Sequence, residues 1–274
     1  MTENGDVSAW QLDEDGPEAY ESYLVPPIFE PWAERMIDLV RLRSDDRILD
    51  VGCGTGIVAR RATAILAGDS PAVGLDINEG MLAIAEEEAI GSEPAIEWRH
   101  GDATDLPFSD EQFDVIFSQQ ALQFLDQPET ALREMHRVLA PEGRVVCSIW
   151  RPIEYQPAYV VLAEAFEQYV GDEAGTMIRG IFPAWNTEYI RSLAREAGFD
   201  DITITIAVGD VRYPSVETFV RREVASSPLA NHIAGLAGDL REELIREVAD
   251  GLTTYVDDEG CISPMETFVL NATH

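Results

Sequence analysis

Residues 47–56 read Arg-Ile-Leu-Asp-Val-Gly-Cys-Gly-Thr-Gly, a short apolar run that ends in three glycines spaced two apart. Ile48, Leu49 and Val51 predict a strand buried on both faces, as in parallel sheets that helices cover on each side. Residues 57–62 then follow a helical pattern. Because glycine lacks Cβ, it accepts positive φ and lets a ligand lie against the main chain. Strand, glycine turn and helix in this order predict a site for a nucleotide-like cofactor at the start of the helix.

A second apolar run, residues 73–76, ends in Asp76, which follows Gly56 by 20 positions. In doubly wound folds, an acid at about this distance binds the ribose of a nucleotide. An ionised carboxylate suits this role because it can accept both ribose hydroxyl protons. Asp76 therefore favours a cofactor turn over the alternative, a glycine-rich loop without a ligand.

The glycine spacing distinguishes between cofactors. Dinucleotide enzymes have Gly-x-Gly-x-x-Gly, whereas this chain has Gly-x-Gly-x-Gly. Residues 50–56, Asp-Val-Gly-Cys-Gly-Thr-Gly, resemble the first motif of class I S-adenosylmethionine-dependent methyltransferases. The resemblance implies that Asp76 holds the ribose and that the loop packs against the methionine part of the cofactor. The loop residues concerned are Asp50, Gly52, Cys53, Gly54 and Gly56.

The resemblance is specific over about residues 44–150 and implies further cofactor contacts. Ile77 and Met81 would lie near the adenine, although helix packing alone would also explain Met81. Asp102 and Ala103 follow a predicted third strand, and an acid in this place accepts a hydrogen bond from the adenine amine in the family. The alternative for Asp102 is a turn aspartate.

Residues 119–123, Gln-Gln-Ala-Leu-Gln, follow the predicted fourth strand and would face the sulfonium methyl group in this fold. Gln119 is the predicted cofactor contact among them. The sequence lacks the Asn/Asp-Pro-Pro-Tyr signature of methyltransferases that act on amino groups of nucleic acid bases and glutamine, which argues against those substrates. Spacing assigns no general base, so the catalytic residues remain unknown; a base is needed only if the acceptor must lose a proton early.

The resemblance implies an α/β fold: a Rossmann-like seven-stranded sheet, mostly parallel with an antiparallel last strand, and helices on both faces. Residues 1–43 are expected to form an acidic tail and a helical lid. The core comprises 44–211 and 263–274, with inserted helices at about 152–186. Residues 212–262 are expected to form a helical cap over the substrate, or alternatively a packing or dimerisation element of a homodimer.

The chain is strongly acidic, with 51 Asp and Glu against 19 Arg and a net charge of −32. Such a surface repels nucleic acids and anionic membranes. It favours a halophilic, acidic proteome in which salt screens the self-repulsion, although an acidic face for a basic partner is the alternative. Residues 1–17 lack periodicity and are predicted to be disordered. Since no signal peptide or apolar run of membrane-spanning length is present, the expectation is a cytoplasmic protein.

The cysteines, Cys53, Cys147 and Cys261, are far apart, and the four histidines do not cluster. This spacing predicts neither a disulfide framework nor a metal site.

The sequence therefore resembles the small-molecule branch of the class I methyltransferases, the methyltransferase type 11 group that includes the ubiquinone/menaquinone-type C-methyltransferases. The expected reaction moves a methyl group from S-adenosyl-L-methionine to carbon or oxygen of a small, partly apolar acceptor and leaves S-adenosyl-L-homocysteine. The protein's part is to align the reacting atoms and exclude water. The alternatives are an NAD-dependent oxidoreductase and a non-catalytic cofactor-binding scaffold.

Overall fold

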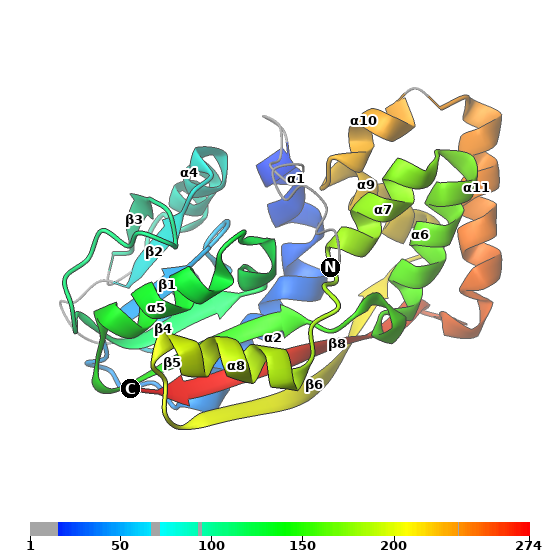
Figure 1. Ribbon diagram of the computed structural model, residues 1–274. Helices are drawn as coiled ribbons and strands as arrows, with labels where there is room; N and C mark the ends of the chain where they lie inside the picture. The colour runs from blue at the N-terminus through cyan, green and yellow to red at the C-terminus, as the bar shows by residue number, and fades with distance from the viewer. Residues whose placement is uncertain (1–15, 67–71, 93–94, 235) are drawn as a thin grey trace. The chain divides into compact units, whose positions relative to one another are not determined.

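Figure 1 shows the computed structural model, which describes residues 16–66, 72–92, 95–234 and 236–274. The predicted disorder of the first residues falls almost wholly on positions 1–15, outside the described part of the chain. The chain divides into two compact units. The sheet unit comprises residues 29–149, 185–207 and 267–274, and the helical unit comprises 150–184, 208–266 and the described part of 1–28.

A mixed sheet has the strand order β3-β2-β1-β4-β5-β8-β6, with the short β7 paired to β8 in antiparallel fashion. β1 pairs in parallel with β2 on one side and with β4 on the other. The strand order therefore reverses beside β1, which is where open α/β sheets bind ligands. The predicted fold class is confirmed, and β7 adds one strand to the seven expected. The strands are β1 Ile48–Val51, β2 Val73–Asp76, β3 Glu97–His100, β4 Phe113–Gln119, β5 Leu139–Trp150, β6 Ile202–Tyr213, β7 Val256–Asp257 and β8 Gly260–Thr273.

Two helices of the sheet unit, α4 and α8, begin at a capping asparagine. The position of Asn78 just before a helical pattern predicts an N-cap, and its side chain accepts hydrogen bonds from the backbone N–H groups of Gly80 and Met81 at 2.9 and 3.2 Å. Asn186 accepts from the N–H of Tyr189 at 2.9 Å in the same way, as side-chain oxygens do at helix starts. The helices are α2 Glu30–Val40, α3 Ile57–Thr63, α4 Glu79–Glu88, α5 Pro128–Val138 and α8 Thr187–Ala197.

One predicted boundary is wrong. The sequence places the start of the fifth strand at Arg144, with Pro141–Gly143 as a helix stop, whereas β5 begins at Leu139. Phe113 pairs with Leu139 but Val115 pairs with Arg144, so the two strands change register. Glu142 lies within this bulge with φ of 65°. An extra segment in one strand of a pair bends it without ending it.

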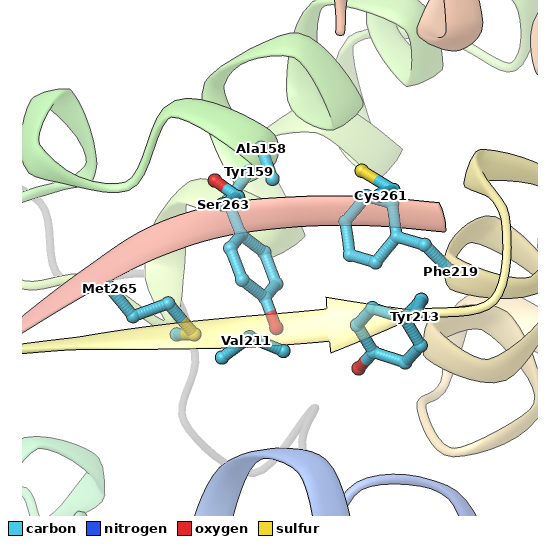
Figure 2. A pocket seen from close by; sticks show the side chains of 8 residues that line it. All are labelled: Ala158, Tyr159, Val211, Tyr213, Phe219, Cys261, Ser263 and Met265. Carbon is cyan, nitrogen blue, oxygen red and sulfur yellow. The ribbon is translucent and has the colours of Figure 1, made fainter. Parts of the chain in front are cut away.

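The helical unit contains α1 Gly16–Tyr23, α6 Pro157–Tyr169, α7 Asp172–Gly180, α9 Val216–Ala225, α10 Leu229–Ala234 and α11 Gly238–Gly251. Gly251 lies against Val161, since a Cβ at Gly251 would be 2.6 Å from Cγ1 of Val161. Ser226 donates a hydrogen bond to the carbonyl of Ala19 at 3.1 Å and so joins α1 to the end of α9. A small apolar pocket in this unit, shown in Figure 2, is lined by Ala158, Tyr159, Val211, Tyr213, Phe219, Cys261, Ser263 and Met265.

The compact units group the described start of the chain with residues 150–184 and 208–266. The division into a lid, a core and a cap concerns functional roles and stays a prediction. Among the helices that the structure describes, none has the length and apolar character needed to cross a bilayer.

Candidate functional site

The glycine turn leads from the end of β1 into α3 and is hydrogen-bonded to the neighbouring strand β2. Gly52 and Cys53 both donate backbone hydrogen bonds to the carbonyl of Leu75, at 2.8 and 3.0 Å. Gly52, Gly54 and Gly56 have φ of 68°, 54° and 84°. Residues with a Cβ rarely adopt such angles, so the left-handed turn itself requires glycine at these positions.

Packing is a second reason for the glycines. A Cβ at Gly52 would lie 2.5 Å from Cβ of Ala121, and a Cβ at Gly56 would lie 2.2 Å from the indole of Trp98. The same indole lies 2.3 Å from a Cβ built at Gly74. Trp98 on β3 therefore supports the turn directly. The reasoning from sequence did not single out Trp98, although its place beside the Gly-containing β2 was a usable signal.

Asp76, at the tip of β2, ties the glycine turn to the start of α4. Its Oδ2 accepts from the N–H of Gly54 and its Oδ1 from the N–H of Asn78, both at 2.8 Å. Burial raises the pKa of this carboxyl, and the backbone donors oppose the rise. Each carboxylate oxygen can accept a second hydrogen bond, so two further donors could be accommodated.

Asp50, the third residue of β1, is only 1% exposed. Its Oδ2 accepts from the N–H of Ala59 on α3 at 3.1 Å, while its buried Oδ1 has no partner among the described residues. Burial raises the pKa of Asp50 to about 7, the Ala59 N–H opposes this, and the charge of Asp76 adds to it. An orphaned buried oxygen of this kind calls for a ligand or water.

Cys53 lies inside the turn, where burial and the neighbouring Asp50 and Asp76 carboxylates raise the pKa of its thiol. The thiol therefore stays protonated and is not a nucleophile, since reactivity belongs to the thiolate. Across the described part of the chain, no group of three or more His, Cys, Asp or Glu side chains is arranged to hold a metal ion.

The residues assigned to the adenine lie at the ends of β2 and β3. The Ile77 side chain is 56% exposed, and Met81 is partly buried on α4. Oδ1 of Asp102 accepts from both the N–H and the hydroxyl of Thr104 at 2.8 Å, which is a turn contact, while Ala103 is buried beside it. These contacts match the turn interpretation of Asp102 and leave its second carboxylate oxygen, Oδ2, as a candidate acceptor.

Two glutamines follow one another at the end of β4. Nε2 of Gln119 donates to the carbonyl of Phe29 at 2.8 Å. Gln120 has φ of 52°, is 4% exposed and donates from Nε2 to the Thr267 hydroxyl at 3.1 Å. Sequence reasoning selected Gln119 and passed over Gln120, because a left-handed glutamine leaves no mark in the sequence.

The structure thus brings part of the predicted site into direct contact. Asp50, the glycine turn and Asp76 are joined through backbone hydrogen bonds around the carboxyl ends of β1 and β2. Asp102 bonds to Thr104 and Gln119 bonds to Phe29 instead.

The family model of the methyltransferase domain matches residues 49–147. A ubiquinone/menaquinone biosynthesis C-methyltransferase UbiE of Pseudomonas fluorescens is 30% identical over 184 residues, which cover 63% of this chain and 72% of that protein. The chain belongs to the class I S-adenosylmethionine-dependent methyltransferases. This methyltransferase uses S-adenosyl-L-methionine as its methyl donor, and the comparisons give the oxidoreductase alternative no support.

Two further comparisons extend the match. A demethylmenaquinone methyltransferase of Symbiobacterium thermophilum is 36% identical to this methyltransferase over 121 residues, 43% of this chain and 48% of that protein, so the match spans about half of that relative. Phosphoethanolamine N-methyltransferase 2 of Haemonchus contortus, solved with S-adenosyl-L-methionine, has a TM-score of 0.61 and 21% identity. That match covers 100% of this chain and 60% of that one, and at this identity it shows the fold alone.

Proposed function

We propose that this methyltransferase transfers a methyl group to a ring carbon of a small quinone-type acceptor in its reduced, hydroxyl-bearing form. The observation that carries the proposal is the 30% identity to a ubiquinone/menaquinone C-methyltransferase over 72% of that protein. The reduced form is chosen because a hydroxylated ring is electron-rich and can attack a methyl group, whereas the oxidised quinone ring is electron-poor.

For the methionine part of the cofactor, the proposed contacts are Asp50 and the turn of Gly52, Cys53, Gly54 and Gly56. The orphaned Oδ1 of Asp50 supports this, because a buried carboxylate oxygen without a partner suits the methionine ammonium, directly or through a water. A nearby cation also favours the ionised form of Asp50.

For the nucleoside part, Asp76 is proposed to accept the ribose hydroxyls on the two remaining lone pairs of its oxygens. Its bonds to Gly54 and Asn78 fix the carboxylate in place before any ligand arrives. Ile77 and Met81 are proposed to flank the adenine ring. Asp102, with Ala103 beside it, is proposed to accept from the adenine amine through Oδ2, and Gln119 to contact the cofactor through its Oε1.

When bound, the donor supplies a methyl group that is carried on a positively charged sulfur. Once this methyl group has been transferred, S-adenosyl-L-homocysteine remains as the product. The chain's own residues bind and orient the donor and exclude water, and orientation of this kind accounts for much of the acceleration of a displacement. The ring carbon that gains the methyl group must also lose a proton, and no side chain among the described residues is assigned as the base that takes it.

The acidic composition supports a cytoplasm rich in salt, where ions screen a net charge of −32. It also supports the absence of nucleic acid partners, because phosphates would be repelled. Homodimer formation through the helical unit remains a proposal that sedimentation would test.

The deciding experiment incubates the protein with methyl-labelled S-adenosyl-L-methionine and a panel of acceptors. The panel pairs a reduced prenylated naphthoquinol and benzoquinol with a catechol and an amine, and products are identified by mass spectrometry. Label on a ring carbon of a quinol is the expected result. Label only on oxygen or nitrogen would contradict the proposed acceptor, and donor binding with no labelled product from a cell extract would favour the scaffold.

A further inference from the structure

Gln120 combines two unusual features at the carboxyl edge of the sheet. It is a non-glycine residue with φ of 52°, and its side chain is 4% exposed. Its Oε1 is buried and, within the described residues, has no hydrogen-bond partner. Strained backbone and unsatisfied buried polar atoms are both costly and concentrate at functional sites.

Neighbouring contacts fix where this amide lies. The backbone N–H of Gln120 donates to the carbonyl of Ser148 on β5 at 3.0 Å. The side chain reaches Thr267 on β8 through Nε2, and the Thr267 hydroxyl in turn donates to the carbonyl of Ile149 at 2.7 Å. Because Nε2 is held by Thr267, the orientation of the amide is set and Oε1 is left as a fixed acceptor.

The direction of the side chain indicates which ligand it serves. β5 and β8 lie on one side of β4, whereas β1 and β2, with Asp50 and Asp76, lie on the other. The residue after Gln120, Ala121, packs against the glycine turn, since its Cβ lies 2.5 Å from a Cβ built at Gly52. Gln120 therefore starts next to the turn and points away from the side that carries the ribose acid.

We infer that Oε1 of Gln120 accepts a hydrogen bond from a hydroxyl group of the methyl acceptor and so orients the acceptor's ring. This inference rests on the proposed function, because it takes the acceptor to be a hydroxyl-bearing quinol. A hydrogen bond to the acceptor gives the buried oxygen a partner and offsets part of the free-energy cost of the left-handed backbone at Gln120. It also makes the amide selective for a hydroxyl, since a methoxy group offers no proton to Oε1.

The test measures acceptor binding to the protein saturated with S-adenosyl-L-homocysteine, by anaerobic calorimetry. The ligands are 1,4-naphthoquinol, kept reduced, and 1,4-dimethoxynaphthalene, which lacks both hydroxyl protons. We expect the wild type to prefer the quinol by about 10- to 100-fold, the effect of a buried hydrogen bond. Gln120→Met, which has similar volume and no acceptor oxygen, should bind both ligands alike and keep its affinity for S-adenosyl-L-homocysteine within about twofold.

Two variants separate this role from a merely structural one. Gln127→Met is the same change at an exposed glutamine outside the proposed site and should keep the preference for the quinol. Gln120→Glu retains an acceptor oxygen and should retain part of the preference. Thermal unfolding of each variant checks that the comparison is made on folded protein.

The outcomes are distinguishable. A wild type that binds no naphthoquinol overturns the proposed acceptor and this inference with it. A wild type that prefers the quinol, with Gln120→Met keeping the same preference, overturns only the role of Gln120. Clearly weaker binding of S-adenosyl-L-homocysteine in Gln120→Met, with the preference intact at saturation, would place the residue at the cofactor instead.

Discussion

At the scale of single residues, two carboxylates beside one turn differ in their surroundings, since Asp50 is buried and Asp76 is partly buried. Asp76 is held by the N–H groups of Gly54 and Asn78, so its geometry is set by the backbone. Asp50 has one satisfied oxygen and one orphaned oxygen, with a pKa raised by burial to about 7. The first suits uncharged hydroxyl donors and the second suits a cationic donor.

Asp76→Ala should raise the dissociation constant for S-adenosyl-L-methionine by about 10- to 100-fold, because two ribose hydroxyls lose a charged acceptor. The N–H of Gly54 also loses its hydrogen-bond acceptor, Oδ2 of Asp76, which loosens the turn. Calorimetric titration with the cofactor measures the effect. Asp105→Ala, at an exposed acid of the same region, is the matched control for the change in net charge. Equal affinity in wild type and Asp76→Ala would remove the ribose assignment.

Asp50→Asn should weaken the binding of S-adenosyl-L-methionine more at pH 8 than at pH 6. Because the pKa of Asp50 is raised to about 7, its carboxyl is about half ionised at neutral pH in the free protein, so most of its charge is present at pH 8 and little of it at pH 6. Titration calorimetry at the two pH values gives the ratio of the dissociation constants of the variant and the wild type. A pH-independent difference between wild type and variant would argue against an ammonium contact.

At the scale of elements, the start of α3 and the strands β2 and β3 meet through two glycines and one tryptophan that complement each other in size. Gly56, just before α3, and Gly74, on β2, both lack a side chain and so leave room for the indole of Trp98. The site is thus a turn supported from one side by an aromatic ring, and the support comes from a strand that is two positions away in the sheet.

Gly56→Ala should lower the free energy of unfolding by about 2–4 kcal/mol, from left-handed strain and overpacking together. Gly91→Ala is the matched control, because Gly91 has a similar φ of 89° but no atom within 4 Å of an added Cβ. The control should cost only about 1 kcal/mol. Denaturant unfolding of both variants gives the difference, and equal losses would contradict the steric role of Trp98.

α5 meets the end of the chain through a histidine stack beside Phe199, which lies two residues past α8. The ring of His136 stacks on His274 at 4.2 Å and lies edge-on to Phe199 at 5.0 Å. Burial and the charge of His274 lower the pKa of His136. Since the unfolded chain then binds the proton more readily than the folded one, the contribution of His136 to stability is present above about pH 6.5 and is lost as the pH falls.

His136→Phe should therefore flatten the dependence of stability on pH between about 7.5 and 5.5. Denaturant unfolding at several pH values measures it, with His232→Phe as the control for removing a histidine. An identical pH dependence in wild type and His136→Phe would show that the stack does not titrate in this range.

At the scale of the whole molecule, the large negative net charge is the feature that most affects stability. A net charge of −32 on 274 residues creates self-repulsion that opposes compact folding unless it is screened. The Debye length falls from about 30 Å at 0.01 M to about 3 Å at 1 M salt, so most of this repulsion is removed by molar salt.

The unfolding temperature should rise by several degrees between 0.05 M and 1 M KCl, as repulsion is screened. Thermal unfolding followed by circular dichroism measures this, and an equimolar series in sucrose controls for effects of exclusion from the surface. A flat response to KCl would indicate that the acidic surface serves a basic partner instead of solvation in salt.

The sequence by itself determined the strands around the glycine turn and the helix caps at Asn78 and Asn186, because periodicity, φ requirements and capping are local properties. The Rossmann-like sheet followed from the resemblance of its glycine motif to that of a known family. The sequence could not determine that Trp98 supports Gly56, that Gln120 is left-handed or that β5 contains a bulge beginning at Leu139. Those features arise from contacts between segments far apart in the chain. The packing of the tertiary structure decides which side chains meet, which buried oxygens remain without a partner, and hence which residues are available to a ligand.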